Sequence, residues 1–174
     1  MKKRVFIVHG WDGYPEEGWF PWLKKELEAR DFEVFVPQLP DPETPRIDRW
    51  VPALAAAVGK PDEQTYFVGH SMGCQTIARY LESLRENIMV GGAVFVAGFF
   101  KRLTNFEDDA VRDIAAAWLT APLDLQKVKQ HLPKSAAIFS DDDPYVPLDN
   151  KEDFENELPR SKLTGYQRLI MCRF

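Results

Sequence analysis

The chain has 174 residues, 45% of them hydrophobic and 28% charged, with a net charge of −5 at neutral pH. This size and composition predict a single globular domain over residues 1–174. The acidic balance gives no basic footprint for nucleic acid, and no apolar run approaches the ~20 residues that cross a bilayer. Two cysteines, Cys74 and Cys172, provide neither a disulfide framework nor a metal-ligand spacing. We therefore expect a cytoplasmic protein with no nucleic-acid or membrane partner and no metal.

Continuous apolar runs mark the predicted strands, because strands buried on both faces of a parallel sheet are apolar along their length. Five strands are predicted, at residues 5–8, 32–36, 65–68, 91–98 and 136–139. Segments with apolar residues at helical spacing lie between them, at residues 19–30, 46–58, 77–84, 105–119 and 125–131. Pro52 is placed most easily in the first turn of the second helix, and the helix at 105–119 is interpreted as either a crossover or a lid.

The alternation of strands and helices predicts the α/β class. More specifically, we expect a three-layer α/β/α sandwich with a mostly parallel sheet. Helices should lie on both faces of that sheet, and we find no internal repeat.

The most informative stretch is YFVGHSMGC, residues 66–74, which contains G-x-S-x-G between Gly69 and Gly73. The pattern predicts a buried strand, a sharp turn at Ser71 and a helix that follows at once, so that the serine hydroxyl is exposed on a strained backbone. The N–H of Met72 would then be a first donor to an oxyanion. The alternative is an ordinary strand–turn–helix corner that contains a serine. Cys74, one turn into the helix, is expected to be a small buried thiol.

A carboxylate is expected in the loop that follows the fifth strand. Serine becomes a good nucleophile when a histidine oriented by a carboxylate takes its proton, and in α/β-hydrolases the acid and then the histidine follow the serine along the chain. Asp141, Asp142 and Asp143 lie in the predicted loop. A solvated turn is the alternative for any one of them, because three adjacent carboxylates repel one another.

Together these motifs resemble the small α/β-hydrolase-fold serine hydrolases of the YdeN and retinoblastoma-binding-protein type. The resemblance covers residues 1 to about 158 and rests on IVHG at 7–10, WFPWL at 19–23, PDP at 40–42 with Trp50, GHSMG at 69–73 and DDPYVP at 142–147. It implies that Ser71 is the nucleophile, that Asp143 is the acid, and that the N–H groups of Met72 and Trp11 form the oxyanion hole. It also implies hydrolysis of small-molecule carboxylic esters, or of related acyl bonds, without a cofactor or metal.

The chain departs from this family in its histidines. By the resemblance, the catalytic histidine should fall near Ile170, but His9, His70 and His131 all precede Asp143. His9 is expected to be structural, His70 to point away from its neighbour, and His131 to be solvated at a helix end. Because no histidine follows Asp143, we expect a weak or inactive hydrolase. The alternative is a non-catalytic binding module that keeps the hydrolase fold.

Residues 159–174 form an atypical tail. They contain four basic residues and no acid, a net charge of +4, whereas residues 1–158 contain 18 basic and 27 acidic residues, a net charge of −9. This shift predicts an altered, truncated or diverged C-terminus in which the final strand and helix are absent or displaced. An exposed sheet edge would then favour self-association.

Overall fold

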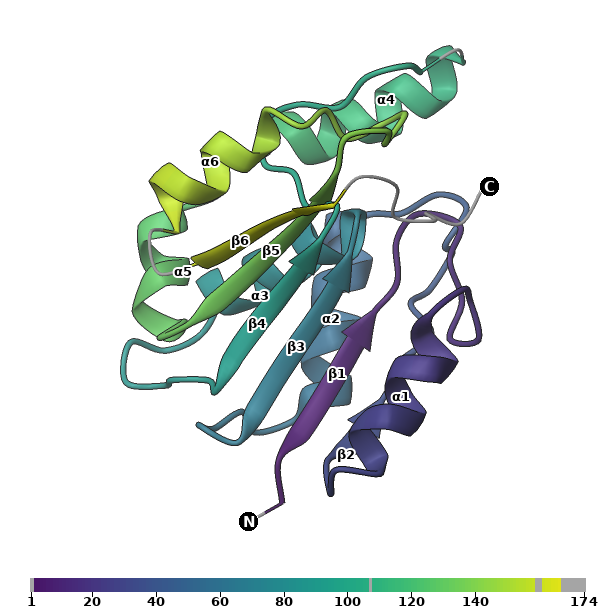
Figure 1. Ribbon diagram of the computed structural model, residues 1–174. Helices are drawn as coiled ribbons and strands as arrows, with labels where there is room; N and C mark the ends of the chain where they lie inside the picture. The colour runs from purple at the N-terminus through teal and green to yellow at the C-terminus, as the bar shows by residue number, and fades with distance from the viewer. Residues whose placement is uncertain (1, 107, 159–160, 167–174) are drawn as a thin grey trace.

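The computed structural model describes residues 2–106 and 108–158 and the backbone of residues 161–166. These residues form one six-stranded sheet in the order β2-β1-β3-β4-β5-β6, and each neighbouring pair of strands is parallel (Figure 1). The strands are β1 (Arg4–Val8), β2 (Glu33–Phe35), β3 (Thr65–His70), β4 (Gly92–Val96), β5 (Ser135–Ser140) and β6 (Ser161–Tyr166). The helices are α1 (Phe20–Glu28), α2 (Ile47–Val58), α3 (Met72–Glu82), α4 (Asp109–Thr120), α5 (Leu125–His131) and α6 (Asn150–Glu157).

The predicted α/β sandwich with a mostly parallel sheet is confirmed, and all five predicted strands are present. In β1, Phe6 and Val8 belong to one buried cluster, while Val5 and Ile7 belong to a second cluster on the other face. The uninterrupted apolar run of β1 thus reflects burial on both sides. None of the helices in the described part of the chain is long and apolar enough to cross a membrane.

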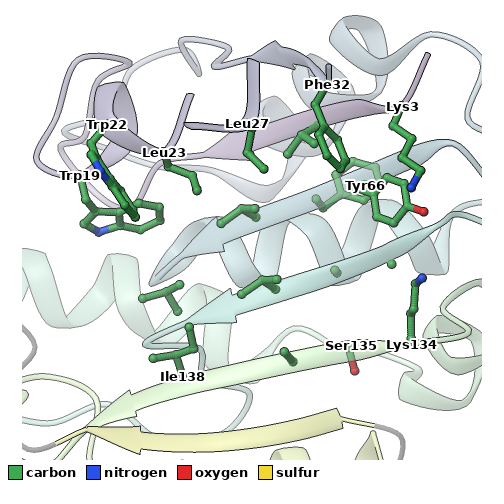
Figure 2. A pocket seen from close by; sticks show the side chains of 18 residues that line it. Lys3, Trp19, Trp22, Leu23, Leu27, Phe32, Tyr66, Lys134, Ser135 and Ile138 are labelled. Carbon is green, nitrogen blue, oxygen red and sulfur yellow. The ribbon is translucent and has the colours of Figure 1, made fainter. Parts of the chain in front are cut away.

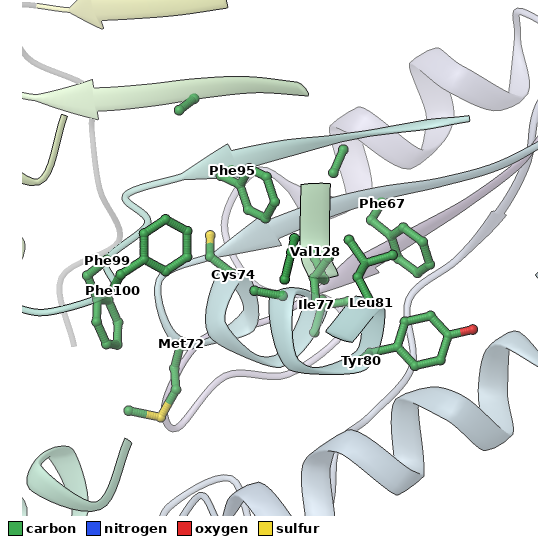
Figure 3. Packing of buried hydrophobic residues seen from close by; sticks show 14 of the residues in the cluster. Phe67, Met72, Cys74, Ile77, Tyr80, Leu81, Phe95, Phe99, Phe100 and Val128 are labelled. Atoms are coloured by element: carbon green, nitrogen blue, oxygen red, sulfur yellow. The ribbon is translucent and has the colours of Figure 1, made fainter. Parts of the chain in front are cut away.

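The larger core lies between the sheet and helices α2, α3 and α5. Figure 3 shows Ile77, Tyr80 and Leu81 of α3 beside Phe67 of β3. The rings of Phe67 and Tyr80 are 5.6 Å apart. Every residue of α3 from Met72 to Leu81 is buried, so the helix that begins directly after Ser71 is held along nearly its whole length.

A buried guanidinium joins α3 to the end of α4. Arg79 donates hydrogen bonds to the carbonyls of Trp118, Ala121 and Pro122 at 2.9, 3.0 and 2.9 Å. The indole N–H of Trp118 donates in turn to the carbonyl of Pro45 at 2.9 Å. The C-terminal end of α4 is therefore fixed within the crossover between β4 and β5.

The second face of the sheet is covered over β1 and β2 by α1, whose Phe20 packs with Val34 in the smaller cluster (Figure 1). Further along this face, Tyr66, Val94 and Ile138 are only half-buried, whereas their neighbours in sequence on the α3 side are buried. Among the described helices, α1 alone lies on this face, so β3, β4 and β5 are left partly uncovered.

The position of Pro52 differs from the prediction. It lies inside α2, five residues after the helix begins at Ile47, and not in the first turn. A proline there removes the N–H that would otherwise bond to the carbonyl of Asp48. The helix continues through Pro52 on a buried face of Trp50, Leu54 and Val58. Trp50 is fully buried, and its indole N–H donates to the carbonyl of Pro40 at 2.8 Å.

The prediction that the final strand is absent or displaced is wrong. The backbone of β6 pairs with β5 from Ser135 opposite Ser161 to Ser140 opposite Tyr166. Ladder hydrogen bonds join backbone groups, so the altered charge of the segment does not prevent pairing. The predicted loss of the last helix concerns residues 167–174, which lie outside the described residues.

Candidate active site

Ser71 lies between β3 and α3, at the edge of the sheet where the strands end. Its backbone has φ 50° and ψ −116°, a conformation that residues with a β-carbon adopt only when the surroundings impose it. The N–H of Ser71 donates to the carbonyl of Val96 at 2.9 Å, and its own carbonyl accepts from the N–H of Cys74 at 2.9 Å. These two hydrogen bonds hold the turn between β4 and the first turn of α3.

The glycines on either side of Ser71 are needed for close packing. A β-carbon on Gly73 would lie 2.3 Å from the carbonyl oxygen of Val8, and one on Gly69 would lie 2.9 Å from the backbone of Cys74. Both contacts are far shorter than van der Waals distance. The spacing of the two glycines therefore matches a strand and a helix that meet at a sharp angle.

The loop after β1 lies against Ser71. A β-carbon on Gly10 would be 3.2 Å from the Cβ of Ser71. The N–H of Asp12 in this loop donates to the carbonyl of Pro42 at 2.8 Å, and this hydrogen bond fixes the loop. Among the described residues, the N–H groups of Trp11 and Met72 donate no hydrogen bond. The two donors that were predicted from the sequence thus have no hydrogen-bond acceptor in the described part of the chain.

The three carboxylates after β5 occupy different environments. Asp141 and Asp142 are exposed, and Asp142 accepts a hydrogen bond from the hydroxyl of Ser140. Asp143 is half-buried, and its Oδ1 accepts from the N–H groups of Tyr145 and Val146, both at 2.9 Å. Its Oδ2 is buried and has no partner among the described residues. A buried carboxylate oxygen without a donor is unfavourable, so Asp143 has a free position for an N–H group.

His9 has a structural environment. Its Nε2 accepts from the N–H of Leu39 at 3.0 Å, and its Nδ1 donates to the carbonyl of Gly10 at 2.8 Å. Burial lowers the pKa of His9, which keeps the ring neutral and suits an acceptor at Nε2. The ring therefore joins the loop after β1 to the proline-rich loop after β2.

His70 faces α1, on the side of the sheet opposite α3. Its ring centroid is 6.0 Å from that of Trp19 and 6.1 Å from that of Phe20, both edge-on. Burial lowers its pKa to about 4, and the nearby His9 adds to this effect. The Nδ1 of His70 has no hydrogen-bond partner among the described residues. His70 is thus a neutral, enclosed ring at neutral pH.

The prediction that His131 is solvated is wrong. The side chain is only 1% exposed, and its Nδ1 lies 2.7 Å from the carbonyl oxygen of Ile88. The carbonyl of His131 also accepts from the N–H of Val90 at 3.0 Å. The helix end that suggested exposure is covered by the segment before β4. Position 170, where the family histidine was expected, lies outside the described residues.

A second partly buried carboxylate, Glu17, carried no signal in the sequence. A β-carbon on Gly13 would lie 2.7 Å from Oε2 of Glu17, and this oxygen has no partner among the described residues. Burial raises the pKa of Glu17, and Asp12 adds to the shift. Glu17 stands in a polar turn, where the sequence pattern does not indicate burial.

Cys74 is fully buried, as the sequence predicted. Its thiol donates to the carbonyl of Val96 at 3.5 Å, and burial raises its pKa. Across the described residues, no group of three or more His, Cys, Asp or Glu side chains is placed to hold a metal ion.

Comparison with known proteins identifies the family. The family model described as "Serine hydrolase" matches residues 5–164, which extends beyond residue 158 into β6. The YdeN protein of Bacillus subtilis (strain 168) is 33% identical over 158 residues, which cover 91% of this chain and 80% of that protein. "Serine hydrolase RBBP9" of Rattus norvegicus is 28% identical over 142 residues, covering 81% and 71% of the two chains.

Comparison with solved structures supports the same family. The crystal structure of the Bacillus subtilis ydeN product superimposes with a TM-score of 0.85 at 32% identity, covering 95% of this chain and 86% of that one. The chain therefore belongs to the serine hydrolase family and has the α/β-hydrolase fold.

Proposed function

We propose that the protein is a serine hydrolase that cleaves small carboxylic esters, with Ser71 as its nucleophile. The observation that carries this proposal is the backbone of Ser71, which is held at φ 50° directly before a buried helix. Such strain is retained where the surroundings impose it, and it clusters at sites of chemistry. An ordinary corner between a strand and a helix does not require it.

In the proposed reaction, the Ser71 hydroxyl attacks the ester carbonyl while the N–H groups of Met72 and Trp11 bind the developing oxyanion. Met72 is the first residue of α3, so the positive end of the helix dipole adds to this stabilisation. The Ser71 proton passes to water, the alkoxide leaves and takes up a proton from water, and a further water molecule hydrolyses the acyl-serine to the carboxylic acid and free Ser71. Loss of one oxyanion donor typically costs ~10²–10³ in kcat, so these N–H groups alone support measurable turnover.

This chain lacks the general base that would accept the proton of Ser71. Asp143 is the proposed acid, and its free Oδ2 is where a histidine N–H would bind. No histidine follows Asp143 in the sequence, and the three that are present are buried in other contacts. General-base assistance is typically worth ~10²–10⁴ in rate. We therefore expect slow turnover, and esters rather than amides as substrates, because an alkoxide leaves without the protonation that an amine requires.

A non-catalytic binding module is the second candidate, and the missing base is the observation in its favour. The two functions differ in whether the Ser71 hydroxyl reacts. Incubation with a fluorophosphonate probe, followed by peptide mapping, should place the phosphonyl group on Ser71. Ser71→Ala should abolish labelling, while Ser83→Ala, a serine at the other end of α3, should leave it unchanged. Absence of labelling after prolonged incubation would leave only the binding module.

A further inference from the structure

Glu17 is a partly buried carboxylate that the proposed mechanism does not use. It lies in the segment between β1 and α1, and its Oε2 is buried against a turn of residues 10–13, called here the β1 turn. A β-carbon on Gly13 would lie 2.7 Å from this oxygen and 2.9 Å from the Cβ of His9. The carboxyl group therefore fills the space beside Gly13 that a side chain would otherwise take.

We infer that Glu17 is a positioning residue for the proposed hydrolysis: its carboxyl group supports the β1 turn, sets the place of the Trp11 N–H beside Ser71, and does so best when it carries a proton. The inference rests on the proposed function, because Trp11 is the proposed second oxyanion donor. Glu17 acts through Gly13 and is not itself a catalytic group.

The β1 turn connects Glu17 to the site. At one end of the turn, Gly10 faces Ser71, since a β-carbon on Gly10 would lie 3.2 Å from the Cβ of Ser71. At the other end, the N–H of Gly13 donates to the carbonyl of Gly10 at 3.2 Å. Trp11 lies between these two glycines. A displacement of Gly13 is thus passed on to the N–H that would bind the oxyanion.

The β1 turn depends on contacts from outside it. Asp12 has φ 54°, a left-handed conformation that is unfavourable for a residue with a β-carbon. Its N–H donates to the carbonyl of Pro42 at 2.8 Å, and the Nε2 of Gln38 donates to the carbonyl of Gly13 at 3.3 Å. Both of these partners belong to the loop after β2. Glu17 supports the turn from the segment that follows it in sequence.

The backbone of Glu17 is anchored, which allows the side chain to act as a support. Its N–H donates to the carbonyl of Tyr14 at 3.1 Å, and its carbonyl accepts from the N–H of Phe20 at 3.0 Å. Phe20 is buried, and its ring centroid is 4.5 Å from that of Trp19. Figure 2 shows Trp19 pointing into the apolar pocket between α1 and the sheet. The segment is therefore fixed directly after Glu17.

The surroundings of Glu17 favour its protonated form. Burial raises its pKa above the usual 4.5, the backbone of Tyr14 opposes this shift, and the charge of Asp12 adds to it. His9, at the end of β1, is kept neutral because burial lowers its pKa, and Gln38 is uncharged. No cation in the described part of the chain offsets the charge of Glu17. The support is thus complete below pH 4.5 and weakens as pH rises through the raised pKa.

Nuclear magnetic resonance tests the support without using the reactivity of Ser71. The full 174-residue chain is labelled with carbon-13 and nitrogen-15, and the Cδ of Glu17 is titrated from about pH 4.5 to 8. The backbone amide peak of Trp11 should shift with the same midpoint as this Cδ. The shift should vanish in Glu17→Gln and persist in Glu16→Gln, the matched control at an exposed neighbour.

Fluorophosphonate labelling of Ser71 tests the consequence for the site. Glu17→Ala leaves a void beside Gly13 and should slow labelling about tenfold at every pH, because misplacement of reacting groups by 1 Å costs as much as 10²-fold. Glu17→Gln keeps the shape without the charge. It should match the unaltered chain at about pH 4.5 and label about threefold faster at about pH 8. Glu16→Gln should match the unaltered chain throughout. Circular dichroism checks that each variant is folded.

Two results would overturn the inference. One is an amide peak of Trp11 that stays in place while Glu17 titrates. The other is a ratio of labelling rates, unaltered chain to Glu17→Gln, that does not change with pH. If Ser71 is not labelled in any variant, the proposed function fails, and the peak of Trp11 alone decides whether Glu17 supports the turn. If Glu17→Ala does not fold, the comparison with Glu17→Gln still decides the question.

Discussion

Gly10 and Ser71 are in direct contact across the edge of the sheet: a β-carbon on Gly10 would lie 3.2 Å from the Cβ of Ser71. We predict that Gly10→Ala shifts the loop after β1 by a few tenths of an ångström and slows fluorophosphonate labelling of Ser71 about tenfold, because misplacement of reacting groups by 1 Å costs as much as 10²-fold. Its stability should fall by less than about 1.5 kcal/mol. The measurements are the labelling rate and urea denaturation.

Gly73→Ala is the contrasting variant, because its new β-carbon would meet the carbonyl oxygen of Val8 at 2.3 Å. It should lose about 3 kcal/mol of stability, as overpacked cores do. If Gly10→Ala and Gly73→Ala lose equal stability, the loop is as rigid as the core, and the argument for a local displacement fails.

The strained backbone of Ser71 predicts that glycine is the more stable replacement. At φ 50° a residue without a β-carbon relieves roughly 1–2 kcal/mol of conformational energy. Ser71→Gly should therefore unfold at a higher urea concentration than Ser71→Ala, although both variants lose fluorophosphonate labelling. Identical midpoints would show that the turn relaxes and stores no strain.

The free carboxylate oxygen of Asp143 predicts chemical rescue by imidazole. Imidazole can donate one N–H to Oδ2 of Asp143 and accept the Ser71 proton at its other nitrogen, as the histidine of a triad does. Hydrolysis of p-nitrophenyl acetate, corrected for imidazole alone, should rise about tenfold or more and saturate with imidazole concentration.

Asp143→Asn should remove this stimulation, because an amide group supports the wrong tautomer. Asp141→Asn is the matched control on the same loop and should retain it. Stimulation that is equal in the two variants would remove Asp143 from the proposed site. Stimulation that persists in Ser71→Ala would show that the reaction does not use Ser71.

The buried ring of His70 predicts a loss of stability in mild acid. Its pKa is about 4 in the folded protein and about 6.5 when unfolded. Between these values the unfolded chain binds a proton that the folded chain does not, so the free energy of unfolding falls as pH decreases from 6.5 to 4. The loss should reach on the order of 3 kcal/mol. Urea denaturation of His70→Gln over this range should show a shallower dependence, and an unchanged slope would refute the assignment.

The strands and the turn at Ser71 were predictable because local sequence decides them. A continuous apolar run such as Val5–Val8 has no stable position except between two layers of helices, and two glycines around Ser71 permit one kind of turn. The burial of His131 was not predictable, since it is covered by a segment distant in sequence. The burial of Glu17 was not predictable either, since it lies against Gly13 in a turn without an apolar pattern. Pro52 was misplaced although the bounds of α2 were predicted to within one residue, because the buried face of Trp50, Leu54 and Val58 keeps the helix continuous through the proline.

The tail shows the same division between local and tertiary information. Its change in charge is evident from composition, but strand pairing depends on the backbone of its neighbour, and β6 forms beside β5. The partly uncovered face of β3 to β5 could not be predicted from the sequence either, because Tyr66, Val94 and Ile138 are as apolar as the residues of a covered strand.

The reactivity of Cys74 reports whether the turn at Ser71 is closed. Its thiol is enclosed between α3 and β4 and bonded to the carbonyl of Val96, which also accepts the N–H of Ser71. No alkylating reagent can reach the sulfur until α3 separates from the sheet. The alkylation rate of Cys74 in native buffer can be measured on its own tryptic peptide. This rate therefore reports how often the structure that holds the proposed nucleophile opens.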